Sequence, residues 1–177
     1  MEFSTGYEVS YRELVIGAGN RIQKIVFPTD KFEFEDVTTL DIDPDCKPDI
    51  LWDLNIRPLP FEDNTFDEIH AYEVLEHIGK QGDYKGFFEE FAEYWRILKP
   101  GGFLIASTPV TEMHRWGDPG HTRHINESTL SFLSQKIYNT GVGKTAMTDY
   151  RSIWKKDFDI VHIERLGESV YWSLQKV

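Results

Sequence analysis

The chain has 177 residues, 40% of them hydrophobic and 14% aromatic, which is enough apolar material for one buried core and short for two. We therefore expect a single domain over residues 1–177. Thirty Asp and Glu against nineteen Lys and Arg give a formal net charge of −11. Such a surface repels a phosphate backbone at long range, so we expect no nucleic-acid partner.

The sequence carries no signal for a membrane or for secretion. Its start, MEFSTGYEVSYREL, lacks a basic segment followed by an apolar run, and no stretch of 18 apolar residues occurs. The lone cysteine, Cys46, excludes an internal disulfide and any CxxC site. We expect a soluble, cytoplasmic protein with no membrane partner, and the sequence predicts no particular oligomeric state.

Three short apolar runs open the chain, and each closes with glycine or with acids. ELVIGAG begins at Glu13, VTTLDID spans 37–43, and DILWDL spans 49–54. Runs of this length and composition are typical of buried strands. Their polar residues stand at the C-terminal ends, where open parallel sheets bind ligands.

The middle of the chain holds the clearest predicted helix. TFDEIHAYEVLEHI, at 65–78, passes from a strand into the first turn of a helix near Glu73. In DYKGFFEEFAEYWRIL, at 83–98, the apolar side chains recur at helical spacing and form one stripe, and KPGG then ends the helix. We interpret the aromatic stripe as packing against a sheet.

The last third adds one strand, one helix and a hairpin. GFLIASTP at 102–109 predicts a buried strand, and NESTLSFLSQKIY predicts a helix with Asn126 as its N-cap. DFDIVHIERL and VYWSLQKV are close enough in sequence to form an antiparallel hairpin. Strands that alternate with helices and end in a hairpin predict an α/β fold with a mostly parallel sheet.

The glycine loop is ambiguous by itself. Gly17 and Gly19 lack Cβ atoms, so this backbone can adopt positive φ and approach a ligand closely. The dinucleotide fingerprint needs a third glycine at position 22, where this chain has Ile22. A purely structural turn also fits these glycines.

Two downstream acids narrow the choice. Asp41 follows the second apolar run, and Asp53 follows the third. A carboxylate at the second strand end can accept hydrogen bonds from both ribose hydroxyls, and one at the third suits the exocyclic amine of adenine. The sequence has no GxxxxGK[ST] motif for a triphosphate. These features predict a pocket for an adenosine with free ribose hydroxyls.

The ordered motifs carry a family resemblance. LVIGAGN, LDIDP, DLNIRPLPFEDNTFDEIHAYEVLEHI and EYWRILKPGGFLIASTP follow one another between Leu14 and Pro109. This series resembles the class I S-adenosylmethionine-dependent methyltransferases, especially the type 11 branch. The resemblance implies a Rossmann-like, seven-stranded, mostly parallel sheet with a C-terminal antiparallel hairpin. It also implies S-adenosyl-L-methionine as the cofactor.

The resemblance assigns roles to the strand-end residues. By it, the glycine loop contacts the methionine part of the cofactor, Asp41 the ribose, Asp53 and the backbone of Leu54 the adenine, and Glu73 the amino group. Asp43 competes with Asp41 for the ribose. For Glu73, an acid at a helix N-terminus is an equally good interpretation. The expected cofactor-binding residues are Gly17, Ala18, Gly19, Asn20, Asp41, Ile42, Asp53, Leu54 and Glu73.

The flanking helices depart from the family pattern at one edge of the sheet. RIQKIVFPTDKFEFED is broken by Pro28 and offers one or two helical turns. PDCKPD, between the second and third strands, is shorter than a parallel crossover usually requires. We expect one short helix and one missing helix there.

The loop from Val110 to Ile125 holds the candidate catalytic residues. We predict that one of His114, His121 and His124 deprotonates or orients the methyl acceptor; the alternative is that they bond the loop to itself. These histidines with Asp118 could also bind zinc or iron, but the spacing matches no metal motif, and we expect no metal.

The sequence therefore predicts a methyltransferase that acts on a small molecule, through oxygen or nitrogen. It lacks the (D/N)PPY signature of nucleic-acid amino-methyltransferases. Two other functions stay open: an inactive S-adenosylmethionine-binding module that acts through a protein partner, and a nicotinamide oxidoreductase, which Ile22 and Asp53 disfavour. Aromatic residues outside the core segments either line an acceptor pocket or pack at the surface; they are Tyr7, Tyr11, Trp116, Tyr150 and Trp154.

Overall fold

The computed structural model describes residues 10–20, 22–25 and 29–177, so the predictions for Tyr7 and Pro28 lie outside the described residues. The strands are β1 (Arg12–Ile16), β2 (Asp36–Asp41), β3 (Ile50–Leu51), β4 (Phe66–Tyr72), β5 (Leu98–Pro109), β6 (Phe158–Leu166) and β7 (Ser169–Lys176). The helices are α1 (Tyr84–Ile97), α2 (Glu112–Gly117), α3 (Glu127–Leu130) and α4 (Gln135–Gly141). Three short 3₁₀ turns are η1 (Pro44–Cys46), η2 (Leu75–His77) and η3 (Ser131–Leu133).

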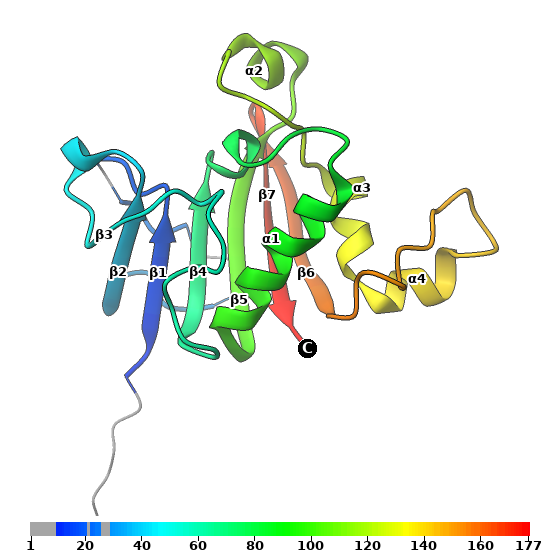
Figure 1. Cartoon of the computed structure of the whole chain (residues 1–177), viewed down its shortest axis with the longest axis horizontal. Coiled ribbons are helices and arrows are strands. Elements are labelled where there is room, and N and C mark those ends of the chain that lie inside the picture. Colours follow the sequence, from blue (N-terminus) through cyan, green and yellow to red (C-terminus); the bar gives the residue numbers. More distant parts are fainter. Residues whose placement is uncertain (1–9, 21, 26–28) are drawn as a thin grey trace, which may run out of the picture.

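The strands form one seven-stranded sheet in the order β3-β2-β1-β4-β5-β7-β6 (Figure 1). The pairs from β3 to β5 are parallel, whereas β7 runs antiparallel to both β5 and β6. The order reverses between β1 and β4, which is where open α/β sheets bind ligands. The predicted fold class is confirmed, including the terminal hairpin.

The hydrophobic core lies on one face of the sheet. Leu14, Ile69, Leu104 and Leu174 point to this face from adjacent strands and belong to a single cluster of buried residues. The helix α1 covers this face of the sheet (Figure 1). The predicted aromatic stripe of α1 packs into the same cluster, which confirms its interpretation as core.

The opposite face is polar and carries no helix among the described residues. There Lys24, Thr29 and Phe34 lie against side chains of β1 and β4. Lys24 forms ion pairs with Glu13 and Glu68, and Phe34 packs edge-on against the His70 ring at 5.2 Å. Glu13, Glu68 and His70 are each 0% exposed. On this face, a buried charged cluster therefore stands where a flanking helix would otherwise pack its apolar side.

Hydrogen bonds keep the carboxylate of Glu68 ionised. Burial alone would raise the pKa of Glu68, but bonds from His70, Lys24, Tyr11 and Thr29 lower it well below its usual range. The donor atoms lie between 2.7 Å (Tyr11 Oη) and 3.0 Å (His70 Nε2) from the carboxylate oxygens. Buried charges are tolerated only when they are paired in this way.

The helix predicted to be missing between β2 and β3 is indeed absent, whereas the short helix predicted between β1 and β2 is not found in the described residues. The described residues between β1 and β2 contain no helix, and η1 is the only helical turn between β2 and β3. Cys46 ends that turn, as its position in PDCKPD suggests. No helix in the part of the chain that the structure describes is long and apolar enough to cross a bilayer.

Two predicted elements differ in detail. The predicted helix after Asn126 is divided into α3, η3 and α4, although Asn126 does cap it, accepting a hydrogen bond from Thr129 N at 3.0 Å. The predicted helical start near Glu73 is wrong. Glu73 has φ +53°, and only the short turn η2 follows it, so Glu73 is not the N-terminal acid of a helix.

Candidate functional site

A cavity of about 350 Å³ lies at the C-terminal edge of the parallel strands. Its walls come from the turns after β1, β2, β3 and β4, since these strand ends lie side by side. Its volume falls within the range of small-molecule sites, roughly 300–1,000 Å³. The lining residues are Gly17, Leu40, Asp41, Ile42, Trp52, Asp53, Leu54, Asn55, Glu73, Val74, His77 and Ile78.

Only glycine fits at position 17 without a change in its surroundings. Its φ is +60°, and a Cβ atom built there would lie 2.3 Å from Cγ2 of Val74. The absence of a side chain thus lets the turn after β1 lie directly against the turn after β4. The backbone of Gly17 forms part of the cavity wall as a result.

Asp41 connects the glycine loop to the end of β2. It is 8% exposed; its Oδ2 accepts a hydrogen bond from Gly19 N at 2.8 Å, and its Oδ1 accepts one from Asp43 N at 2.9 Å. An ionised carboxylate has about four lone-pair sites, so roughly two remain available. Asp41 can therefore accept two further hydrogen bonds from a ligand in the cavity.

Asp43, the competing acid, serves the next turn instead. It is the N-cap of η1, and its Oδ1 accepts a hydrogen bond from Asp45 N at 2.9 Å. It does not line the cavity. The geometry thus favours Asp41 over Asp43 as the ligand-facing acid.

Asp53 and Glu73 face the cavity from two other strand ends. Asp53 Oδ1 accepts hydrogen bonds from Asn55 N and Nδ2 at 2.8 and 3.0 Å, which fixes the turn after β3. Ser107 Oγ donates to Glu73 Oε1 at 2.7 Å, and Glu73 N donates to Ser107 O at 3.0 Å. Both carboxylates retain free lone pairs for a ligand.

The rest of the predicted loop lies beside the cavity without lining it. Ala18 is 7% exposed and donates its N–H to Leu40 O at 3.3 Å. Gly19 contributes through its bond to Asp41, and the Asn20 side chain is exposed. These residues position the loop, while the cavity itself is built by their neighbours.

The structure separates the three predicted catalytic histidines. His114, on α2, lies with its Nε2 2.7 Å from the Oε2 of exposed Glu168. His121 lies against Glu76 and His77, with the two imidazole rings 4.6 Å apart. His124 lines a different cavity, described below. None of the three lines the cavity at the strand ends.

Sequence reasoning missed Glu76 and His77. They form the turn η2, directly after Glu73, and His77 lines the strand-end cavity. Glu76 is 1% exposed, and burial raises its pKa to about 8. The motif VLEHI placed them next to the predicted site, but nothing in its spacing indicates that the loop of His121 packs against it.

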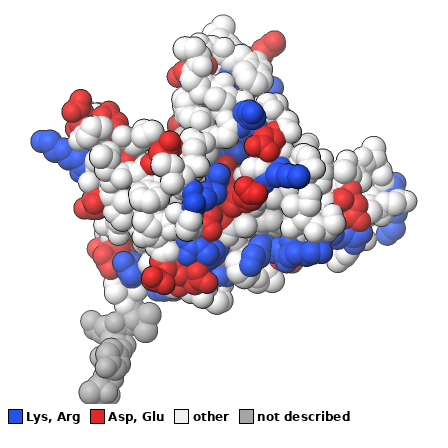
Figure 2. Space-filling model, in the orientation of Figure 1, with Lys and Arg blue, Asp and Glu red and all other residues white. Residues whose placement is uncertain are grey.

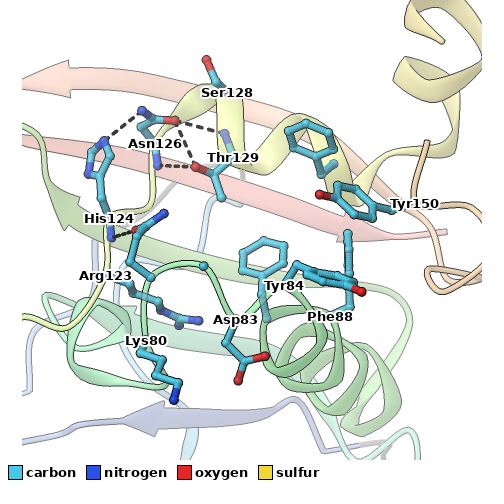
Figure 3. Close-up of a pocket in the computed structure, with 14 residues that line it drawn as sticks. Lys80, Asp83, Tyr84, Phe88, Arg123, His124, Asn126, Ser128, Thr129 and Tyr150 are labelled. Carbon is cyan, nitrogen blue, oxygen red and sulfur yellow. Dashed lines mark hydrogen bonds between the residues drawn. The ribbon is translucent and has the colours of Figure 1, made fainter. Parts of the chain in front are cut away.

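A second cavity of about 400 Å³ lies between the start of α1 and the segment that leads into α3 (Figure 3). Tyr84, Phe88 and Tyr150 form an aromatic wall, with the rings of Tyr84 and Tyr150 stacked at 5.4 Å. Of the aromatic residues that the sequence singled out, Tyr150 is in this wall, whereas Trp154 is core and Trp116 is 52% exposed.

His124 and Arg123 form the polar side of this cavity (Figure 3). Asn126 Nδ2 lies 2.8 Å from His124 Nε2; Asn126 Oδ1 is used by Thr129, so the amide donates and the His124 proton is on Nδ1. Burial, together with the charge of Arg115, lowers the pKa of His124 and keeps it neutral. Arg123 donates to Leu75 O at 2.8 Å and to Glu90 at 2.7 Å.

The two cavities share one segment of chain. His77 and Ile78 line the strand-end cavity, and Lys80 and Gln81 line the aromatic one. Thr122 and Arg123 donate their N–H groups to Glu76 O at 2.9 and 3.3 Å, which joins this segment to the loop after β5. The sheet order and these strand-end carboxylates define the class of protein: an α/β fold with an acid-lined cavity at its topological switch point, where open α/β sheets bind ligands.

The sequence of the chain shows which family it belongs to. Residues 14–106, more than half of the chain, match the family model described as "Methyltransferase domain" (Methyltransf_11). The protein belongs to this family of class I S-adenosylmethionine-dependent methyltransferases. The methyl donor of the family is S-adenosyl-L-methionine, in agreement with the resemblance seen in the sequence.

Curated relatives are similar over part of their length. The chain is 31% identical, over 45% of its residues, to a probable S-adenosylmethionine-dependent methyltransferase of Mycolicibacterium smegmatis, of which it covers 30%. It is 30% identical, over half of its residues, to sterol 24-C-methyltransferase of Saccharomyces cerevisiae, of which it covers 22%. The chain thus spans less than a third of these relatives.

Solved structures share the fold over nearly the whole chain. An S-adenosylmethionine-dependent methyltransferase of Archaeoglobus fulgidus aligns over 96% of this chain and 88% of its own, with a TM-score of 0.59 and 15% identity. The N-methyltransferase NodS of Bradyrhizobium japonicum, solved with S-adenosylhomocysteine, aligns over 94% and 78%, with a TM-score of 0.55 and 13% identity.

Proposed function

We propose that the protein transfers a methyl group from S-adenosylmethionine to a small molecule, at an oxygen or nitrogen atom. The observation that carries the proposal is the pairing of two cavities along one segment: an acid-lined cavity at the strand ends and an aromatic-walled cavity of about 400 Å³. When bound, the cofactor supplies an electrophilic methyl group on a sulfonium.

The strand-end residues fit this cofactor. The spare lone pairs of Asp41 match two ribose hydroxyls, and Asp53 suits an amine donor at the next strand end. Glu73, an exposed carboxylate, suits a cationic amino group. The bare backbone at Gly17 gives the amino-acid part of the cofactor a close approach. Together, these donors and acceptors complement an adenosine with an amino-acid tail. A triphosphate, by contrast, would be repelled by the three carboxylates.

The acceptor is proposed to bind in the aromatic-walled cavity. Tyr84, Phe88 and Tyr150 suit the apolar or aromatic body of a small molecule, and His124, Arg123 and Asn126 offer polar contacts at the opposite side. Positioning of this kind can lower the activation barrier by roughly 7–11 kcal/mol without a dedicated catalytic residue.

Surface charge supports a small-molecule acceptor. On the face shown in Figure 2, Lys and Arg side chains are interspersed with Asp and Glu. The formal charge of the chain is −11. A phosphate backbone would be repelled by this excess of acid at long range, whereas a small molecule is guided by the local contacts of its cavity.

Among the predicted base candidates, His121 lies nearest to the cofactor residues, because it contacts His77 and Glu76. His114 is engaged with Glu168, and the Nε2 lone pair of His124 is engaged with Asn126. We propose His121 as the histidine most able to orient the acceptor or accept its proton.

The test is transfer of radiolabelled methyl groups from S-adenosylmethionine into a metabolite extract that is separated into small-molecule, protein and RNA fractions. We expect label in the small-molecule fraction and none above background in the RNA fraction. The Asp41→Asn variant, which should bind the cofactor weakly, is the negative control.

Calorimetry with S-adenosylhomocysteine separates the alternatives. Cofactor binding without transfer to any extract fraction would support the inactive module that acts through a partner. Binding of NAD in place of S-adenosylhomocysteine would contradict the proposal altogether.

A further inference from the structure

Three side chains able to ligate a metal meet at the edge of the strand-end cavity. Glu76 and His77 lie in η2, and His121 lies on the loop after α2. Each offers one ligand atom, and these atoms all lie within 4.8 Å of one another. Two imidazole nitrogens and one carboxylate oxygen at this separation suit a divalent transition metal.

Both imidazoles are held in the tautomer that a metal requires. His121 Nδ1 lies 2.9 Å from Arg115 O, and His77 Nδ1 lies 3.1 Å from Gly120 O. A carbonyl oxygen only accepts, so each Nδ1 carries a proton, and Nε2 is the nitrogen that a metal would bind. Backbone carbonyls commonly orient metal-binding histidines in this way.

The carboxylate of Glu76 lacks a partner that would explain its burial. It is 1% exposed, and neither of its oxygens accepts a hydrogen bond within the described ranges. His121 Nε2 lies 3.9 Å from its Oε1. The adjacent cation, Arg123, directs its donors to Leu75 O and Glu90 instead. A buried polar group without a hydrogen-bond partner is unfavourable unless a ligand binds it.

A second cluster of the same kind is already satisfied. Glu13, Glu68 and His70 also bring their ligand atoms within 4.8 Å, but the Lys24 ammonium group pairs with both carboxylates. That cluster has its cation within the chain. The cluster of Glu76, by contrast, has two imidazoles, and no Lys or Arg among the described residues forms an ion pair with its carboxylate.

We propose that Glu76, His77 and His121 form a binding site for a divalent transition metal, with zinc as the reference ion. This set differs from the loop histidines that the sequence grouped together, since His114 and His124 lie elsewhere. Asp118 is on the same loop, but its Oδ1 accepts from Gly120 N at 2.7 Å.

Three protein ligands leave a coordination position for water or for an acceptor atom. A hydroxyl bound there has a lowered pKa, and His77 already lines the cofactor cavity. In this second role, which rests on the proposed methyl transfer, His121 orients the acceptor through the metal and does not accept its proton. Metal binding itself does not rest on methyl transfer.

The test is calorimetry with zinc chloride on tag-free, chelator-treated full-length protein, with a competing chelator to set the affinity scale. We expect one zinc ion per chain with a Kd of about 1 µM or tighter. His77→Gln and His121→Gln should each weaken binding by about 100-fold or more. His77 is exposed, so its variant should remain folded, and circular dichroism checks this.

The matched control is His114→Gln, which removes a histidine of the same loop and should leave zinc affinity unchanged. Absence of zinc binding by the wild-type protein would overturn the proposal. So would zinc binding that neither His77→Gln nor His121→Gln weakens. Titration of the metal-free protein with S-adenosylhomocysteine runs in parallel, so a failure of the metal site is distinguished from a failure of the cofactor site.

Discussion

The change Asp41→Asn tests whether the acid at the end of β2 holds the ribose. In the structure its two oxygens accept hydrogen bonds from Gly19 N at 2.8 Å and Asp43 N at 2.9 Å. Asparagine keeps one accepting oxygen and places an amide donor where the other backbone N–H points. The variant must therefore give up one bond to the loop, and it also loses acceptor capacity toward the ribose.

The size of the effect follows from the charge of the lost acceptor. A hydrogen bond to a charged group contributes about 1.5–3 kcal/mol, so the loss of one ribose bond should raise the Kd for the cofactor by about 10- to 150-fold. Loss of the loop bond, by the same measure, should lower Tm by roughly 3–12 °C for a chain of this length. Any side chain at Gly17 would instead collide with Val74, so the acid is the cleaner probe.

The assay is calorimetric titration with S-adenosylhomocysteine, with Asp43→Asn as the control of equal charge. Asparagine caps helical turns as well as aspartate does, so Asp43→Asn should keep η1 and bind within about twofold of the wild type. If Asp41→Asn binds as tightly as the wild type, or if Asp43→Asn loses as much affinity, the assignment of the ribose acid is refuted.

Three further predictions concern adenine, acceptor and stability. Asp53→Ala should weaken S-adenosylhomocysteine binding by about 10-fold but leave unchanged the binding of the inosine analogue, which lacks the amine; equal losses would contradict the role of Asp53. Tyr84→Ala removes the ring stacked on Tyr150 and should raise the KM for the acceptor by about 2- to 10-fold at constant cofactor affinity, whereas Phe32→Ala, at a ring 72% exposed, should change neither. The pKa of Glu68 is lowered from 4.5 in the folded state, so its contribution to the free energy of unfolding is present above that pH and is lost as the pH falls. Glu68→Gln should flatten this loss when urea unfolding is measured against pH. An unchanged pH profile would count against the charged cluster.

The acids of the cofactor site could be predicted because their position depends only on topology. Parallel strands bring their C-terminal ends to one edge, so residues just past these strands lie around the same edge of the sheet. Even β3, which is only Ile50–Leu51, brings Asp53 and Leu54 into the wall of the strand-end cavity. An error of a few residues in the strand boundaries therefore did not disturb the site.

The cluster of Glu76, His77 and His121 could not be predicted, because it depends on how two loops pack. The N–H groups of Thr122 and Arg123 bind Glu76 O, and these contacts join segments more than forty residues apart. Hydrophobic periodicity carries no information about such a contact. The histidines grouped by sequence proximity were in fact dispersed by the turns of their own loop.

The burial of the polar face of the sheet could not be predicted either, for a different reason. In β4, Glu68, His70 and Tyr72 alternate with apolar residues, which is the pattern of a strand with one face in water. Yet Glu68 and His70 are 0% exposed. Burial of that face requires Lys24 from a segment without helical or strand periodicity, and only the three-dimensional arrangement shows the pairing.

The site survives the loss of helices because those helices are not what positions it. Gly17 and Glu73 are placed by the ends of β1 and β4, and Gly17 packs directly against Val74. The second face of the sheet must also be covered, and the carboxylates buried there would be unfavourable without a paired cation. Lys24, paired with Glu13 of β1 and Glu68 of β4, joins these two strands on that face. An ion-paired loop can thus replace a helix as long as it holds together the strands that carry the binding turns.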